Sequence, residues 1–272
     1  MMTNRPFLNS IPPVIRNLLL INVGMALLTW MAGRIMHIDL NALLGLYTPG
    51  TANFKPYQFV TYMFMHGGLE HLFFNMFALW MFGRILEQVW GGKRMLIYYT
   101  VTGLGAALIH TGINYLSLRS IQADAAAVLA APSPDAFAAF VSEHFKAYYD
   151  QIYSRLLDSW YTHPYSQVHI NQAAAYMQQL IDMQANIPTV GASGAVYGVL
   201  LAFGMMFPNT QLMLLIPPIP IKAKWMVIGY GALELILGLT QPGSNVAHFA
   251  HLGGMIFGYF LIKHWQQQRT YY

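Results

Sequence analysis

Cysteine is absent from the 272 residues of this chain, and charged residues are scarce. The first absence excludes disulfides, a thiolate nucleophile and thiolate metal ligands. Asp, Glu, Lys and Arg make up 9% of the sequence, whereas a soluble domain carries about 25%. The 14 Lys and Arg residues are scattered, so no nucleic-acid-binding patch is expected. With 56% hydrophobic residues, the composition is typical of an integral, multi-pass membrane protein.

Long apolar stretches account for most of the chain. A membrane-spanning helix needs roughly 20 mostly apolar residues, and six segments reach or approach that length. They are Val14 to Met36, Phe59 or Leu69 to Val89, Met95 to Leu116, Ser193 to Pro208, Trp225 to Leu239, and Asn245 to Trp265. The stretch from Ile38 to Gln58 is interrupted by prolines and is expected to lie at the membrane interface. The sequence therefore predicts an all-α bundle of six transmembrane helices.

One region has a different composition. Leu118 to Gln184 contains six acidic and three basic residues, and its apolar residues recur at helical spacing. This pattern is typical of amphipathic helices in water. We therefore expect one membrane domain, residues 1–272, interrupted at 117–188 by an extracytoplasmic helical insertion between the third and fourth spans.

The distribution of basic residues predicts the orientation. Six spans place both termini on one side, and that side holds nine of the Lys and Arg residues. The positive-inside rule then puts both termini in the cytoplasm, and we expect the cytoplasmic (inner) membrane of a bacterium. The insertion and the starts of the second, fourth and sixth spans would lie on the outer side.

Two kinds of intramembrane active site lack their signatures. A zinc protease needs His-Glu-x-x-His, but Glu70-His71 has no second histidine at that spacing. His248 and His251 have no carboxylate or third histidine beside them in the sequence. An aspartyl site needs two intramembrane carboxylates, and the predicted spans contain no Asp. No metal or cofactor is therefore expected.

Polar residues gather instead at the outer ends of three predicted spans, where each is a functional hypothesis. They are Ser193 and Tyr197 in the fourth span, His66, His71 and Asn75 at the second, and His248 and His251 in the sixth. A histidine can take the proton of a serine nucleophile, and fixed N–H donors can bind the oxyanion of acyl transfer. Glu234 falls toward the middle of the fifth span, so the pattern favours a Ser-His dyad. Taken alone, Gly191 to Gly198 also fits a small-residue packing seam between helices.

Three motifs in this order resemble the rhomboid family of intramembrane serine proteases. They are His66-Gly67-Gly68-Leu69-Glu70-His71-Leu72-Phe73-Phe74-Asn75, then Gly191-Ala192-Ser193-Gly194 with Tyr197, then Ala250-His251-Leu252-Gly253-Gly254 with Gly258. The resemblance implies that Ser193 is the nucleophile and His251 the general base. It also implies that His71, Asn75 and the N–H of Ser193 bind the oxyanion, that Tyr197 stacks on the imidazole, and that His66 supports the loop. Glu87 falls where the family has a structural acid.

Two histidines compete for the role of base. The family has glycine three and seven residues after its catalytic histidine, and His251 is followed by Gly254 and Gly258 at those positions. His251 is therefore the preferred base, with His248 as the alternative. Gly254 and Gly258 are expected to face Gly194 and Gly198, drawing the fourth and sixth spans together.

The resemblance implies an endopeptidase that cleaves transmembrane proteins within the lipid bilayer through an acyl-enzyme, without a cofactor. The alternative is a non-catalytic protein of the same fold that binds transmembrane helices and retains or escorts them. An intact pair of Ser193 and His251 favours the protease, because a purely binding relative has no need of it.

Overall fold

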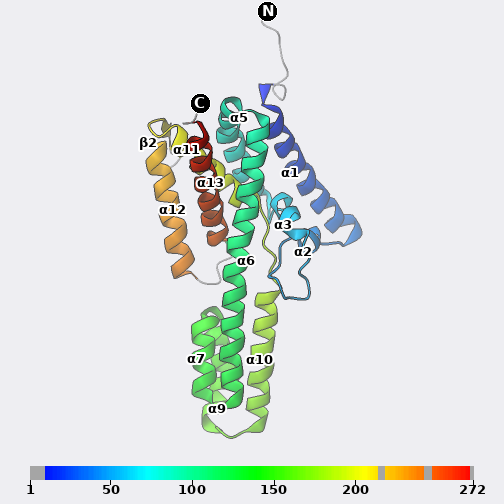
Figure 1. The fold of residues 1–272 in the computed structure, drawn as a ribbon. Helices are drawn as coiled ribbons and strands as arrows, with labels where there is room; N and C mark the ends of the chain where they lie inside the picture. The colour runs from blue at the N-terminus through cyan, green and yellow to red at the C-terminus, as the bar shows by residue number, and fades with distance from the viewer. Residues whose placement is uncertain (1–9, 214–217, 242–246, 270–272) are drawn as a thin grey trace, which may run out of the picture. The chain divides into compact units, whose positions relative to one another are not determined.

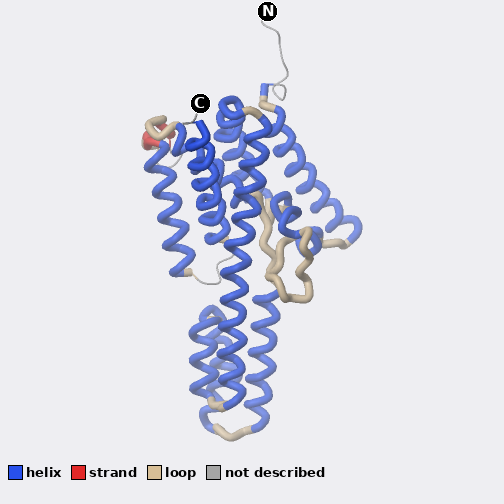
Figure 2. The backbone as a smooth tube through the Cα atoms, viewed as in Figure 1, coloured by secondary structure: helices blue, strands red, loops and turns tan. Residues whose placement is uncertain are grey.

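The computed structural model describes residues 10–213, 218–241 and 247–269. Helices dominate, and one short pair of strands is present in these ranges (Figure 2). The longer helices are α1 (Pro13–Met31), α4 (Leu69–Ala78), α6 (Gly92–Ala130), α7 (Pro134–His144), α10 (Gln167–Ala185), α11 (Ser193–Met206), α12 (Ala223–Thr240) and α13 (His248–Arg269). The shorter ones are α2 (Leu40–Leu44), α3 (Gln58–Thr61), α5 (Arg84–Trp90), α8 (Tyr149–Ile152) and α9 (Asp158–Thr162). Strands β1 (Gln211–Met213) and β2 (Pro220–Lys222) pair antiparallel, with Gln211 opposite Lys222.

Two compact units divide the chain. The first comprises Met1–Leu46, Phe54–Thr111 and Pro188–Tyr272, and the second comprises Tyr47–Asn53 and Gly112–Ile187. Helix α6 contributes its first half to one unit and its second half to the other. The longer part of the second unit, Gly112–Ile187, has nearly the same bounds as the insertion predicted at 117–188, and the unit also includes Tyr47–Asn53.

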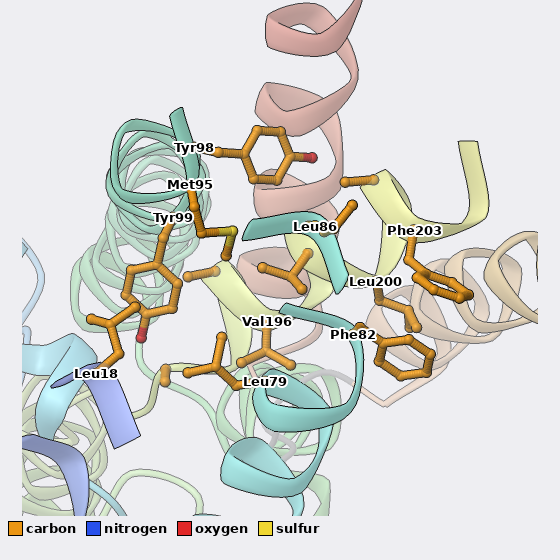
Figure 3. Close-up of a cluster of buried hydrophobic side chains, with 14 of the residues drawn as sticks. Leu18, Leu79, Phe82, Leu86, Met95, Tyr98, Tyr99, Val196, Leu200 and Phe203 are labelled. Atoms are coloured by element: carbon orange, nitrogen blue, oxygen red, sulfur yellow. The ribbon is translucent and has the colours of Figure 1, made fainter. Parts of the chain in front are cut away.

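The core of the first unit is built from apolar side chains of α1, α4 to α6 and α11, some of which Figure 3 shows, with further residues from α12 and α13. Leu79 and Leu86 are completely buried, and so are Met95 and Val199. The helices that surround this core nevertheless expose large apolar side chains outward. On α1, Leu27 and Trp30 are 59% and 63% exposed. An apolar outer face of this kind is compatible with lipid and not with water.

Three helical segments of the described residues are long and apolar enough to cross a membrane: Pro13–Met36, Gly92–Ala130 and Ala223–Thr240. Helix α11 is apolar but shorter, as the sequence predicted for the fourth span. Two helix boundaries can be compared with the prediction. Of the two predicted starts of the second span, Phe59 and Leu69, a long helical segment begins at Leu69 and runs through a π-helical turn (η4, Leu79–Gly83) to Trp90. Helix α6, which contains the predicted third span, continues past Leu116 to Ala130, because the Ala-rich sequence there has high helix propensity.

A carboxylate from α5 caps the first helix. The backbone N–H groups of Val14 and Ile15 donate to Oε1 and Oε2 of Glu87, at 2.9 and 2.8 Å. Pro12 precedes α1 and its side chain cannot accept these bonds, so the cap comes from 72 residues away. Glu87 is buried, and it satisfies donors that a helix start otherwise leaves unpaired. The start of α1 and the end of α13 lie at this same end of the unit (Figure 1), where the rings of Trp90 and Trp265 are 5.6 Å apart.

The second unit has a separate core. The second half of α6 packs with α7 and α10 around the buried rings of Phe137 and Trp160. Ser133 caps α7 by accepting a hydrogen bond from the N–H of Ala136. These are amphipathic helices of the kind that the apolar spacing predicted for this region. Asn53 and Asn186 join the ends of the unit with a side-chain hydrogen bond of 2.6 Å.

Candidate active site

The segment before Ser193 is fixed from three directions. Thr189 forms two backbone hydrogen bonds with Leu46, each of 2.9 Å, and its hydroxyl lies 2.8 Å from Nε2 of His110. The N–H of Gly191 donates to the carbonyl of Tyr62. Helix α11 then begins at Ser193, and Ala192 provides no side-chain cap. The first N–H groups of α11 therefore remain available for a ligand, as at any uncapped helix start.

Ser193 meets a histidine from α13. Nε2 of His251 lies 2.8 Å from Oγ of Ser193, within hydrogen-bonding distance. The ring of Tyr197, one turn along α11, stacks on the His251 imidazole with centroids 4.2 Å apart and an interplanar angle of 4°. Of the two candidate bases, the structure places His251 against the serine, and His248 makes different contacts.

A carboxylate that the sequence did not place at the site lies beside this pair. Oε2 of Glu234, on α12, lies 3.0 Å from Nδ1 of His251, within ion-pair distance, although that N–H is not aligned for a hydrogen bond. Oε1 accepts a hydrogen bond from the hydroxyl of Tyr197. From the sequence, Glu234 was expected near the middle of the fifth span and therefore away from the site. The position of a residue along a helix does not determine which neighbouring helix its side chain faces. A signal was present, because Glu234 is the one acid in an otherwise apolar helix.

His248 is the second partner of the same carboxylate. Its Nδ1 lies 2.6 Å from Oε2 of Glu234, and both side chains are buried. Glu234, His248 and His251 present possible ligand atoms within 4.8 Å of one another, the one such group found among the described residues. Two histidines and a carboxylate can hold Zn²⁺. The sequence shows no carboxylate near the two histidines, but in the structure Glu234 of α12 lies beside both of them.

His71 lies beside the residues that precede the serine. A side-chain carbon added at Gly191 would come within 2.7 to 2.9 Å of the His71 ring and 3.5 Å of Oγ of Ser193. Gly191 also has a φ of +131°, which disfavours any larger residue. The His66 ring packs edge-on against the His71 ring, with centroids 5.2 Å apart. The backbone carbonyl of His66 accepts a hydrogen bond from the side chain of Asn41.

Asn75 stands on α4, the helix that carries His71, and α4 packs against α11. Its side chain is buried, and Nδ2 has no hydrogen-bond partner among the described residues. A buried amide donor without a partner carries a free-energy cost of about 1–3 kcal/mol. Such a cost is accepted where a ligand is to be bound, which suits the oxyanion role that the resemblance implies.

Glycines bring the backbones of α11 and α13 into contact. A carbon added at Gly254 would lie 1.9 Å from the carbonyl oxygen of Gly194. The expected pairing of Gly198 with Gly258 is wrong. Both residues face α6: the nearest atoms to an added carbon belong to Thr102 at Gly198 and to Tyr98 at Gly258. The space left by these two glycines is filled by α6 side chains, and the Tyr98 hydroxyl donates to the carbonyl of Gly198.

The rhomboid domain family matches this chain over residues 53–148 and 166–265. The chain belongs to the rhomboid family. The matched ranges contain Ser193, Tyr197, Glu234, His248 and His251, as well as His66, His71 and Asn75. This rhomboid is a predominantly helical integral membrane protein. The gap between the two matched ranges, residues 149–165, lies within the second compact unit.

Two relatives illustrate how far the likeness extends. Rhomboid protein 1, mitochondrial, of Saccharomyces cerevisiae is 23% identical over 255 residues, which cover 87% of this rhomboid and 66% of the yeast protein. Rhomboid-like protein 11, chloroplastic, of Arabidopsis thaliana is 42% identical over 53 residues, or 20% of this chain and 19% of the plant protein. This rhomboid thus spans just under two thirds of the length of the yeast relative. No solved structure gave a significant match.

Proposed function

We propose that this rhomboid is an intramembrane serine endopeptidase that hydrolyses peptide bonds of transmembrane proteins. The observation that carries the proposal is the 2.8 Å separation of Ser193 Oγ and His251 Nε2, with Tyr197 stacked on the imidazole. A hydroxyl becomes an effective nucleophile when an adjacent base takes its proton, and the stacked ring limits the rotation of that base. A protein that only bound helices would not require this pair.

The reaction proceeds through an acyl-enzyme. Oγ of Ser193 bonds to the scissile carbonyl carbon while its proton passes to Nε2 of His251, and the carbonyl oxygen becomes an oxyanion. The C–N bond then breaks, and the leaving nitrogen takes the proton from Nε2. Water, activated by the same imidazole, hydrolyses the ester and restores Ser193.

Three donors would stabilise the oxyanion. The N–H of Ser193 stands at the uncapped start of α11, and His71 lies against Gly191 beside the serine. Nδ2 of the buried Asn75 has no hydrogen-bond partner among the described residues. Loss of one such donor typically lowers turnover by about 10²- to 10³-fold. His66 would act indirectly, by packing against His71.

The same fold supports a proposal for the membrane arrangement. We propose six spans: Pro13–Met36, Leu69–Trp90, the first part of α6, α11, α12 and α13. Residues 117–188 would form an extracytoplasmic insertion, and both termini would be cytoplasmic. The start of α1 and the end of α13 lie at one end of the first unit (Figure 1), as an even number of spans requires.

The test uses a fluorophosphonate probe, which reacts with an activated serine, on purified protein in lipid vesicles, together with cleavage of a single-span substrate. Labelling and cleavage are expected for the wild type and absent for Ser193→Ala and His251→Ala. Labelling of Ser193→Ala equal to the wild type would overturn the proposal. A chelator is expected to leave labelling unchanged. Loss of labelling in the presence of the chelator would point instead to a metal held by Glu234, His248 and His251.

A further inference from the structure

We propose that Glu234 is a positioning residue for His251, so that a serine, a histidine and a buried glutamate act together. The inference rests on the proposed function and extends it. It is drawn from the site geometry, in which three transmembrane helices each contribute one member: Ser193 from α11, His251 from α13 and Glu234 from α12.

The carboxylate is held in place through both of its oxygens. Oε1 accepts the Tyr197 hydroxyl, and Oε2 lies 2.6 Å from Nδ1 of His248 and 3.0 Å from Nδ1 of His251. Glu234 is 5% exposed, so its charge is shielded little by water. Removal of a carboxylate from water is costly, and this one is compensated by two imidazoles and a phenol.

Tyr197 links the members of this group. Its ring stacks on His251 and its hydroxyl contacts Glu234. The imidazole therefore contacts the phenol ring with its face and Ser193 through Nε2, and its Nδ1 lies 3.0 Å from the carboxylate. Each contact restricts a different motion of the ring.

The charge of Glu234 acts when the proton moves. Once Oγ of Ser193 has bonded to the substrate carbon, His251 carries the serine proton and is an imidazolium. A carboxylate about 3 Å from Nδ1 stabilises that cation and favours the proton on Nδ1 in the resting ring, which leaves Nε2 free to accept. The Nδ1–H of the resting enzyme is not yet aligned with Oε2; such contacts often tighten only in the substrate complex.

Substitution of Glu234 by glutamine removes the charge but keeps an acceptor, and leucine removes both. We expect the fluorophosphonate labelling rate constant to fall at least about tenfold in Glu234→Gln and further in Glu234→Leu. The upper limit is about 10⁴-fold, the loss known for a trypsin-like triad without its acid. The final labelled fraction is expected to stay near the wild-type value in Glu234→Gln. A purely structural role would lower that final fraction and leave the rate constant of the folded molecules unchanged.

Glu87→Gln is the matched control, because Glu87 is also a buried carboxylate and contacts none of the site residues. It is expected to keep the wild-type rate constant. If Glu234→Gln does not fold, Tyr197→Phe provides the test instead. This variant keeps the ring that stacks on His251 but loses the hydrogen bond to Oε1 of Glu234. Its labelling rate constant is expected to fall by about three- to tenfold. Wild-type rates in Glu234→Gln, or in Tyr197→Phe where the first variant does not fold, would overturn this inference alone. A wild type that does not label would instead overturn the proposed function.

Discussion

Replacement of Gly254 by alanine adds a single carbon where the backbones of α11 and α13 touch. That carbon would lie 1.9 Å from the carbonyl oxygen and 2.7 Å from the carbonyl carbon of Gly194. Both are backbone atoms, so no side-chain rotation relieves the overlap. To restore an ordinary contact, the two helices must separate by about 1 Å or more.

The expected effect on the reaction follows from where the separation occurs. Gly194 follows Ser193 directly, and Gly254 stands three residues after His251, so the shift acts on the 2.8 Å contact of the pair. A misplacement of about 1 Å costs on the order of 10²-fold in rate. Overpacking of a tight interior also costs about 1–3 kcal/mol in the free energy of unfolding.

The assay compares fluorophosphonate labelling rates of the wild type, Gly254→Ala and Gly229→Ala. An added carbon at Gly229, on α12, would meet no atom within 4 Å, so this control is expected to label at the wild-type rate. Labelling of Gly254→Ala within about twofold of the wild type, with unchanged stability, would refute the role of this contact in setting the geometry.

Two further outcomes are expected. Glu87→Gln keeps one acceptor for the start of α1 and leaves one buried N–H unpaired, so the free energy of unfolding in SDS titrations should fall by about 1–3 kcal/mol; an unchanged value would show that the cap contributes nothing. The chain has no cysteine, so a single introduced cysteine reports on which side of the membrane its position lies. In intact cells, a membrane-impermeant maleimide is expected to label Ser166→Cys. It is expected to label Gln267→Cys only after the membrane is permeabilised. The reverse pattern would contradict the proposed orientation.

Much of the fold was predictable because membrane helices can be identified in a sequence by their length and their lack of charged residues. The sequence predicted α1, α11 and α12 close to their observed bounds. The start of the second span was ambiguous, since the stretch after Phe59 is apolar enough to be helical and only the structure shows that it folds as short turns before Leu69. The extent of α6 was underestimated because a change from apolar to Ala-rich composition marks a change of surroundings, not the end of a helix.

The site was predictable where motifs carry it and not where tertiary packing does. Ser193, His251, Tyr197 and His71 follow from local spacing and from the resemblance, and the structure brings them together. Glu234 is 17 residues from His251 in the sequence, and its contact depends on how α12 is rotated about its axis against α13. No spacing encodes that rotation. The partners of Gly198 and Gly258 were missed for the same reason, because which helix fills the space beside a glycine is a property of the whole bundle.

The cap that Glu87 provides has a consequence for the order in which the protein is made. Helix α1 is synthesised before Glu87, so its first N–H groups must bond to water or lipid head groups until α5 is in place. Only 11% of the most apolar stretch of Pro13–Met36 is buried, and the buried residues of α1, Ile15, Leu18 and Asn22, all lie in the part of the helix nearer to Glu87. Helix α1 is thus fixed late, and mainly through the half that begins at Pro13.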